Sequence, residues 1–362
     1  MRTPGDRPPA RKGRGATYNP KVRFERSETD PFDDGWGSLE AMREEAAPPR
    51  TEILADRTRS IIARNTSPDI PFEQSINPYR GCEHGCIYCY ARPSHAYWGL
   101  SPGLDFETKI FAKFDAAKLL EEELSRPGYR CRVISLGANT DPYQPQERRL
   151  KITRSILEVL ARCRHPLGIV TKSAAVTRDL DLLAPMAEQG LVRVFFSITT
   201  LDAALARRLE PRAAAPHRRL QALEELSRAG VPSGVMMAPI IPAINDREIE
   251  AVLEAAANAG AAQAGYTFLR LPHEIKDLFK AWLEEHEPLK AQHVLSLVRQ
   301  SRGGQLYDST FGRRMKGEGV YAQMIARRIE LARQRFGLDR SLPPARSDLF
   351  RPPARDGQLQ MF

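Results

Sequence analysis

Three cysteines lie within eight residues of one another, with the spacing C-x3-C-x2-C at Cys82, Cys86 and Cys89. Thiolates on so short a loop can hold three corners of a cubane [4Fe–4S] cluster, which ordinarily takes four cysteines. With three protein ligands one iron stays open, and an open iron can chelate a substrate or cofactor. The spacing therefore predicts a cluster with one reactive iron.

A structural zinc ion is the alternative, with His84 or His95 as its fourth ligand. No second C-x2-C pair is present to complete a zinc ribbon, and the other two cysteines, Cys131 and Cys163, stand alone in the sequence. An odd count with three clustered members does not indicate a disulfide framework. In a reducing cytosol, clustered thiols are more often metal ligands, whereas the two isolated cysteines are expected to be ordinary packing residues.

An open iron can bind the amino and carboxylate groups of S-adenosylmethionine (SAM). One electron from the cluster would then cleave the sulfonium and yield a 5′-deoxyadenosyl radical, while the protein orients the reactants and excludes side reactions. Tyr88, just before the third cysteine, fits a position facing the adenine. We expect an electron donor such as flavodoxin or ferredoxin to reduce the cluster.

Six short β-rich runs alternate with helical patterns through the middle of the chain. The runs span 74–76, 132–136, 167–171, 191–197, 233–237 and 265–269. One helical pattern precedes each run from the second onward, at 114–125, 152–163, 177–189, 214–229 and 246–259. Strands separated by helices of this length form right-handed βαβ units with a parallel sheet. Six units are too few for a full eight-fold barrel, so the prediction is an α/β fold, a partial (βα)6 barrel with its chemistry at the C-terminal strand ends. The cysteine loop follows the first strand.

The chain divides by composition into four segments. Residues 1–50 are rich in Pro, Arg, Gly, Asp and Glu without apolar periodicity, which predicts a disordered basic segment. The barrel is expected over 51–272, and a helical extension over 273–340, with helices at 273–301 and 317–335. Prolines in 341–362 predict a flexible tail.

Further motifs follow the predicted strands. They read Gly137-Ala-Asn-Thr-Asp141-Pro-Tyr-Gln-Pro145, Val170-Thr-Lys172-Ser173, Ser197-Ile-Thr-Thr200, Leu209-Glu-Pro211 and Ala238-Pro-Ile-Ile-Pro242-Ala-Ile-Asn-Asp246. With the cysteine loop they make the sequence, over about 75 to 335, similar to the radical SAM superfamily. More narrowly, it resembles the spore photoproduct lyase-like, "DNA repair photolyase" branch, most of whose members lack an assigned substrate.

The resemblance implies that side chains at the strand ends bind SAM. The implied contacts are Tyr88 to the adenine, Asn139, Thr140 and Asp141 to SAM or substrate, Lys172 to the methionyl carboxylate, and Ser197 and Thr199 to the ribose. Simpler readings stay open: a solvated strand-end lysine for Lys172, a helix cap for Ser197, and a turn residue before Pro142 for Asp141.

Catalytic residues are less defined than the cofactor contacts. Tyr90, Tyr97 and Tyr143 are candidate radical relays, with ordinary packing as the alternative, and Asp141 is a further candidate. Spore photoproduct lyase carries a cysteine hydrogen donor at the end of its second strand. The corresponding segment here, Ser135-Leu-Gly-Ala-Asn139, has no thiol, so that step is not carried over.

Positive charge is concentrated at the two ends of the chain. The net charge of +9 divides into +6 over residues 1–26, +7 over 299–362 and −4 between them. Basic ends on a mildly acidic body suggest contact with a polyanion, most simply nucleic acid, although solubility alone would also explain them. We expect nucleic acid as the substrate, with damaged DNA as one candidate. The alternatives are modification of RNA or protein, or a non-catalytic, zinc-bearing nucleic-acid-binding protein.

The chain ends in Gln358-Leu-Gln-Met-Phe362, an apolar cluster on a polar tail. It resembles the peptides that dock on the bacterial replication sliding clamp, with docking back on its own domain as the alternative. The polar, basic segment Tyr307 to Gly319 is expected to contact substrate over the barrel mouth, or else to be an ordinary connector. No apolar run is long enough to span a membrane, and no secretory signal is recognisable, so a cytoplasmic location is expected.

Overall fold

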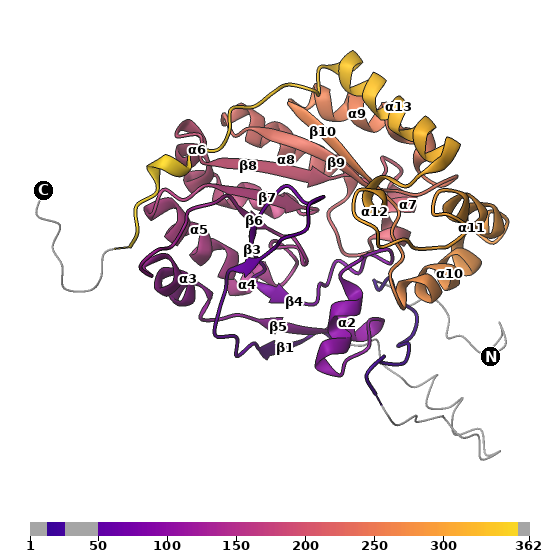
Figure 1. The fold of residues 1–362 in the computed structure, drawn as a ribbon, viewed down its shortest axis with the longest axis horizontal. Helices are drawn as coiled ribbons and strands as arrows, with labels where there is room; N and C mark the ends of the chain where they lie inside the picture. Colours follow the sequence, from indigo (N-terminus) through magenta and orange to yellow (C-terminus); the bar gives the residue numbers. More distant parts are fainter. Residues whose placement is uncertain (1–12, 26–49, 354–362) are drawn as a thin grey trace, which may run out of the picture.

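The structure is a computed structural model that describes residues 13–25 and 50–353 (Figure 1). The predicted clamp-binding peptide Gln358–Phe362 and the arginine-rich stretch before Gly13 lie outside the described residues. Within the described part of the chain, no helix is both long and apolar enough to cross a membrane.

The main sheet has seven strands in the order β10-β9-β8-β7-β6-β3-β2. Six of them are parallel and follow one another in sequence order: β3 (Gln74–Ile76), β6 (Ile134–Leu136), β7 (Leu167–Thr171), β8 (Val192–Ser197), β9 (Ser233–Ile240) and β10 (Gln263–Phe268). The two-residue strand β2 (Ala63–Arg64) pairs antiparallel with β3. The predicted partial (βα)6 barrel is thereby confirmed, because each parallel pair is joined by a helical crossover.

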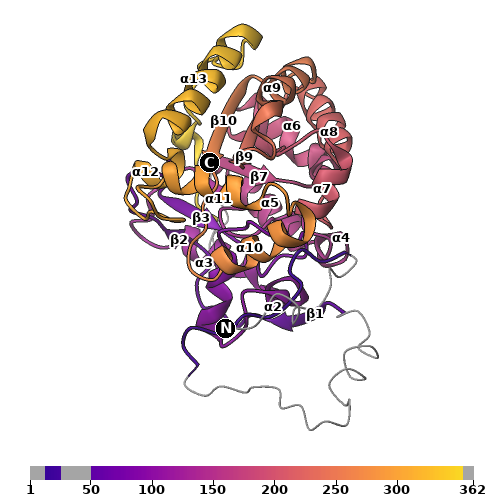
Figure 2. The same ribbon diagram turned by 90° about the vertical axis from the view of Figure 1, so that its right-hand side faces the viewer.

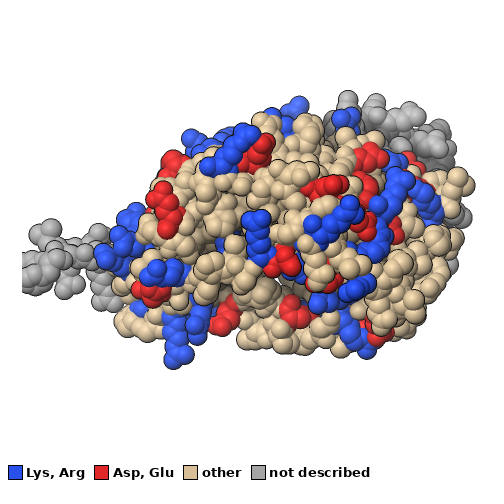
Figure 3. Space-filling model, turned by 90° about the horizontal axis from the view of Figure 1, so that it is seen from above, with Lys and Arg blue, Asp and Glu red and all other residues tan. Residues whose placement is uncertain are grey.

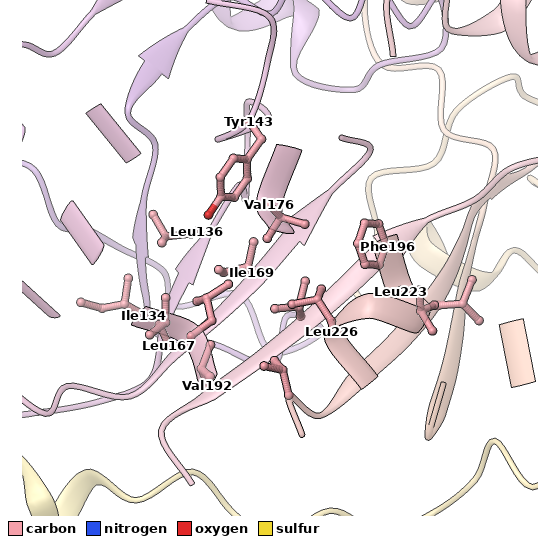
Figure 4. Packing of buried hydrophobic residues seen from close by; sticks show 14 of the residues in the cluster. Ile134, Leu136, Tyr143, Leu167, Ile169, Val176, Val192, Phe196, Leu223 and Leu226 are labelled. Carbon is pink, nitrogen blue, oxygen red and sulfur yellow. The ribbon is translucent and has the colours of Figure 1, made fainter. Parts of the chain in front are cut away.

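Helices cover the outer face of the sheet in the predicted intervals. They are α3 (Ala116–Leu124), α5 (Ile152–Arg162), the 3-10 helix η3 (Ala174–Asp179) with α6 (Leu180–Glu188), α8 (Pro216–Arg228), and η4 (Asp246–Glu248) with α9 (Ile249–Asn258). Two shorter helices, α4 (Glu147–Leu150) and α7 (Ala203–Leu209), lie in the loops. In α5 the residues Ile152, Ile156 and Leu160 recur every four positions and are buried, as an amphipathic helix requires. Alternate strand residues such as Leu167 and Ile169 form the core beneath the helices (Figure 4).

The C-terminal extension consists of four helices, α10 (Ile275–His286), α11 (Ala291–Gln300), α12 (Arg313–Lys316) and α13 (Gly319–Phe336) (Figure 2). The helical run expected over 273–301 is interrupted at 287–290, where Pro288 cannot continue a helix. Helices α10 and α11 share a hydrophobic cluster with Cys86 and Tyr88. The extension therefore supports the cysteine loop as well as the barrel.

A second, three-stranded sheet was not predicted. Its order is β1-β5-β4, from β1 (Glu52–Ala55), β5 (Lys109–Ala112) and β4 (Tyr79–Arg80), and it lies at the bottom of Figure 1 beside α2 (Leu104–Thr108). Strand β4 leads directly into Cys82. The 3-10 helix η2 (Arg92–Trp98) follows the third cysteine, so the cysteine loop is framed by this small layer on both sides.

Residues 13–25 are packed against the small layer, so the expectation of disorder over 1–50 does not hold for them. Ala16 is fully buried, and the backbone N–H groups of Gly15 and Ala16 donate to the Glu107 carboxylate at 3.0 and 2.8 Å. A Cβ on Gly15 would lie 1.8 Å from the Gly85 carbonyl oxygen, so only glycine fits there.

Residues 339–351, here called the C-terminal strap, are also ordered, which differs from the flexible tail predicted from residue 341. The strap begins with a β-bridge from Asp339 to Gln263. Its N–H groups at Arg346 and Arg351 then donate to the carbonyls of Gly190 (3.1 Å) and Cys163 (2.9 Å). These contacts precede β10, β8 and β7. The strap therefore crosses the N-terminal ends of the strands, opposite the ends that lead to the cysteine loop, and reaches the left of Figure 1 in yellow.

Candidate functional site

A buried ion pair supports the cysteine loop. Arg92 and Glu107 have no exposed side-chain surface, and their Nη2 and Oε1 atoms are 2.5 Å apart. The same guanidinium donates to the carbonyls of Cys86 (2.9 Å), Gly85 (3.0 Å) and Gly103 (2.9 Å). A buried charge pair is tolerated when its remaining hydrogen-bonding capacity is satisfied, and that condition is met here. The pair fixes the loop backbone and hence the directions of the thiols.

The three thiols form a mutually interacting set in this loop. Cys82 and Cys86 are buried and Cys89 is half-buried. Burial raises the pKa of the Cys82 thiol, and the nearby Asp141, Cys86 and Cys89 raise it further. Burial likewise raises the pKa of Cys86, with Glu210 adding to the effect. Thiols that oppose one another's ionisation suit a cationic iron cluster, which would bind all three as thiolates.

Two observations bear on the zinc alternative. Among the residues described, no three His, Cys, Asp or Glu side chains converge on a point where one metal ion could sit. Of the two candidate histidine ligands, His95 has its Nε2 3.0 Å from the Lys109 carbonyl, and His84 has its Nδ1 3.3 Å from Asp141. The Nδ1 of His95 is buried without a hydrogen-bond partner.

The C-terminal ends of β6, β7 and β8 bring Asp141, Lys172 and Ser197 together. The Asp141 carboxylate accepts hydrogen bonds from the Thr171 hydroxyl (2.8 Å) and the Lys172 N–H (2.7 Å). Lys172 Nζ donates to the Ser197 hydroxyl at 2.7 Å, which donates in turn to the Ala238 carbonyl at 3.1 Å. Lys172 is thus not a solvated strand-end lysine, and Ser197 is not a helix cap.

The Asp141 carboxylate makes the turn contact that was considered for it and also accepts hydrogen bonds from β7. Its carboxylate accepts the Tyr143 N–H at 2.9 Å, which is the expected turn contact, besides its bonds to β7. Burial would raise its pKa, but the neighbouring His84 and the hydrogen bonds from β7 outweigh burial and hold the pKa at about 2. The group is therefore a carboxylate at neutral pH and acts here as an acceptor and a fixed negative charge.

Asn139 and Thr140 lie at the same edge but are tied to the first strand end. Their N–H groups both donate to the Asn77 side-chain oxygen, at 2.8 and 3.2 Å. The buried Thr140 hydroxyl donates to the Tyr79 carbonyl at 2.8 Å. Thr140 therefore fastens the loop after β6 to β4, while the half-buried Asn139 stands beside it.

The buried carboxylate of Glu210 holds Tyr88 in place; it belongs to the motif Leu209-Glu-Pro211, to which the sequence alone assigned no role. Glu210 accepts a hydrogen bond from the Tyr88 hydroxyl and one from Thr199 (2.7 Å), and it forms an ion pair with Arg219 of α8. Burial would raise its pKa, but Arg219 and Lys172 outweigh burial and hold the pKa at about 2. Tyr88 is therefore anchored through its hydroxyl to a permanent anion, and Lys172 Nζ lies 5.8 Å from the centre of its ring.

The tyrosine relay candidates occupy different environments. Tyr90 is exposed, its hydroxyl donates to the Ala138 carbonyl, and the Arg270 guanidinium lies 5.2 Å from its ring centre. It thus joins the loops after β6 and β10 at the barrel mouth. Tyr143 belongs to the hydrophobic core (Figure 4), and its hydroxyl donates to Asp179 at 2.9 Å. The structure does not present Tyr143 to the cysteine loop.

Comparison with known proteins agrees with this site. The family model described as the radical SAM superfamily matches residues 76–256. An uncharacterized protein of Mycobacterium tuberculosis is 36% identical over 233 residues, covering 64% of this chain and 68% of the relative. An uncharacterized protein of Acidianus two-tailed virus is 30% identical over 198 residues, covering 52% of this chain and 64% of the relative.

Solved structures of spore photoproduct lyase share the fold. One variant of that enzyme matches with a TM-score of 0.56 and 16% identity over 79% of each chain. The enzyme in complex with dinucleoside spore photoproduct matches with a TM-score of 0.52 and 19% identity over 78% of this chain and 77% of the lyase. A further match contains bound SAM. From the family model, the shared fold and the three-thiol loop, we conclude that this chain belongs to the radical SAM superfamily and is an enzyme that uses a [4Fe–4S] cluster and SAM.

Proposed function

We propose that this enzyme acts on nucleic acid, with damaged DNA as the substrate class, and that Cys82, Cys86 and Cys89 hold its cluster. When bound, the cluster and SAM supply a 5′-deoxyadenosyl radical by one-electron cleavage of the sulfonium. The chain's own part is to orient the reactants. In this proposal Tyr88 lines the adenine, Lys172 pairs with the methionyl carboxylate, and the strand-end hydroxyls of Ser197 and Thr199 accept hydrogen bonds from the ribose.

The observation that carries the choice of nucleic acid is the pairing of aromatic rings with arginines at the mouth. Tyr90, next to the third cysteine, lies under the Arg270 guanidinium. The exposed ring of Phe311 lies 4.7 Å from the Arg314 guanidinium, at the start of the basic helix α12. Rings of this kind can stack on unpaired bases. Arg314 forms an ion pair with Asp69 at 2.5 Å, so Arg270 is the arginine of the two that is placed to neutralise a phosphate. Spore photoproduct lyase, which shares the fold, binds a dinucleoside lesion.

The outer helices are a poorer candidate for this contact. On the face seen in Figure 3, basic and acidic side chains are interspersed rather than gathered by sign. On α13, for example, Arg328 forms an ion pair with Glu250 of α9, at 2.6 Å. The positive charge counted along the C-terminal sequence is thus partly neutralised within the fold, which favours the mouth as the contact with nucleic acid.

Binding to single-stranded DNA is expected to weaken steeply as salt is raised, since each neutralised phosphate releases counterions. Arg270→Ala should lower the affinity roughly 10- to 150-fold, because losing a charge-assisted hydrogen bond to a phosphate costs about 1.5–3 kcal/mol. Fluorescence anisotropy with labelled oligonucleotides at several salt concentrations measures both effects.

The matched control for Arg270→Ala is Arg327→Ala, which removes an exposed arginine from α13 and should leave affinity nearly unchanged. Parallel titrations with RNA distinguish the two nucleic acids. Absence of salt-dependent binding to either would contradict the proposal and favour a protein or small-molecule substrate. Transfer of label from 5′-deuterated SAM would then identify the molecule that the radical attacks.

Lys172→Ala is expected to weaken SAM binding roughly 10- to 150-fold, because a lost charge-assisted hydrogen bond costs about 1.5–3 kcal/mol. Equilibrium dialysis with the reconstituted enzyme measures the dissociation constant, and the visible spectrum of the cluster should persist. Lys118→Ala, on the outer face of α3, is the control and should bind SAM as the wild type does. Normal binding by Lys172→Ala would leave the lysine with only its structural contact to Ser197.

Two protein partners complete the proposal. Flavodoxin or ferredoxin would provide the electron, and a sliding clamp would bind the tail Gln358–Phe362. The C-terminal strap supports the proposal of a sliding clamp, since its last backbone contact is to Cys163, at the end of the barrel opposite the mouth. A clamp held there would leave the mouth open to DNA. A synthetic peptide of these five residues is the probe for clamp binding.

A further inference from the structure

A row of packed aromatic rings leads from the cysteine loop toward the surface. Phe106 lies in one cluster with Cys82, and its carbonyl accepts the Cys82 N–H at 2.9 Å. From Phe106 the ring centres continue to His95 (5.2 Å), Phe111 (6.1 Å) and Trp98 (5.7 Å). The loop rests directly on this row, because a Cβ on Gly81 would lie 3.0 Å from the His95 ring.

The inner rings of the row are buried and carry no charge of their own. Phe106 and His95 are buried, and burial lowers the pKa of His95 to about 4. The imidazole is therefore neutral at physiological pH, and its Nε2 is fixed to the Lys109 carbonyl. No step in the binding of SAM or of the proposed substrate uses these rings, so the row is unexplained by the site already described.

The outer end of the row opens into an aromatic patch, defined here as Phe24, Tyr97 and Trp98. The side chains of Tyr97 and Trp98 are 72% and 48% exposed, and Phe24 is also exposed. A hollow of about 370 Å³ lies beside Phe24 and Tyr97. Large exposed rings grouped in this way are typical of surfaces that bind another macromolecule.

Two arginines border the patch. The Arg80 guanidinium lies 4.4 Å from the Trp98 ring centre, and the Arg23 guanidinium lies 5.3 and 5.9 Å from those of Phe24 and Tyr97. Each forms an ion pair with one carboxylate, Asp56 for Arg80 and Glu274 for Arg23, both at 2.5 Å, so the arginines add little net charge to the patch. Arginine and aromatic residues are enriched at the centre of protein interfaces.

We propose that the aromatic patch is the docking surface for a small electron-carrier protein, and that the ring row is the path by which its electron reaches the cluster. The step transfers one electron: the carrier is oxidised by one electron and the cluster is reduced by one, with no bond made or broken. This inference rests on the proposed radical chemistry, which needs that electron. Contact between the rings matters because electron transfer slows steeply with the distance between carrier and cluster.

The test compares two reductants, using flavodoxin hydroquinone as the protein probe. Trp98→Ala and Tyr97→Ser should slow bleaching of the cluster by flavodoxin roughly 10-fold or more, the usual loss at an interface hot spot. Both variants should release 5′-deoxyadenosine at the wild-type rate with dithionite, which needs no docking surface. Trp98→Phe should restore much of the flavodoxin rate. Leu289→Ala, at a 99% exposed apolar residue between α10 and α11, is the control.

Binding gives a second readout that does not require catalysis. Calorimetry should show flavodoxin binding to the enzyme, weaker in Trp98→Ala and Tyr97→Ser by the same factor as the rate. Wild-type rates and affinities in both variants would overturn the docking surface. So would a loss of dithionite-driven cleavage in both, since the residues would then be shaping the site itself. Failure of the wild type to cleave SAM with dithionite would instead refute the proposed chemistry, while the calorimetry would still decide the docking.

Discussion

Replacing any one of Cys82, Cys86 and Cys89 with Ala is expected to reduce the release of 5′-deoxyadenosine to background. In the proposed site each thiolate would bind a different iron, so two remaining ligands would leave two irons open and the cluster labile. The measurement is chromatography of the nucleoside after anaerobic reconstitution, with dithionite and SAM, alongside iron and sulfide analysis. Loss of the brown absorbance should accompany loss of activity.

The two remaining cysteines are the controls for that experiment. Cys131 is half-buried and Cys163 lies in the main hydrophobic core. Cys131→Ala and Cys163→Ala should therefore keep both cluster and activity, with at most a small loss of stability from the removed sulfur in the core. Unchanged SAM cleavage by any single variant of the loop cysteines would refute the ligand assignment.

Arg219→Met is expected to lower the free energy of unfolding by about 3–5 kcal/mol, because it leaves the buried Glu210 carboxylate without its counter-charge. Urea denaturation followed by circular dichroism measures the change. Arg228→Met is a matched control on the same helix, α8. Arg228 pairs with Glu224 at the surface, where the two side chains are 74% and 44% exposed, so its loss should cost about 0–1 kcal/mol.

A double variant separates the ion pair from simple loss of packing. In Arg219→Met with Glu210→Leu no buried charge is left unpaired, and most of the lost stability should return. SAM binding should not return with it, because Tyr88 and Thr199 would still lack the oxygen to which both donate. An Arg219→Met variant as stable as Arg228→Met would show that the buried pair contributes little to the fold.

The six barrel strands could be predicted because they are short apolar runs between helices of regular length. The runs 74–76 and 167–171 coincide with β3 and β7, and the others differ from the observed strands by a few residues at their ends. The sheet β1-β5-β4 was missed because its strands have four residues or fewer and no helical spacing between them. The strap was missed because its prolines argue against helix and sheet but not against docking through single hydrogen bonds.

The site residues that lie at the C-terminal ends of the strands could be predicted from the sequence. The parallel sheet brings Asp141, Lys172 and Ser197 to one edge, as the strand order requires. The pairs Arg92–Glu107 and Glu210–Arg219 could not be predicted as pairs, because charged residues in a single sequence read as surface. Tyr143 is a case that the sequence left open: it was a candidate relay with ordinary packing as the alternative, and it lies in the hydrophobic core.

The C-terminal strap also has a consequence for how the protein is made. A ribosome releases residues 339–351 only after the whole barrel has been synthesised, yet these residues cover Tyr129 and His165, with Phe350 at 5.5 and 5.3 Å from their rings. Until then the nascent chain presents an uncovered apolar edge beneath β6 and β7. A message cut short before codon 341 would leave that edge open permanently. Cellular quality control would then recognise the incomplete protein by the surface that the C-terminal strap otherwise covers.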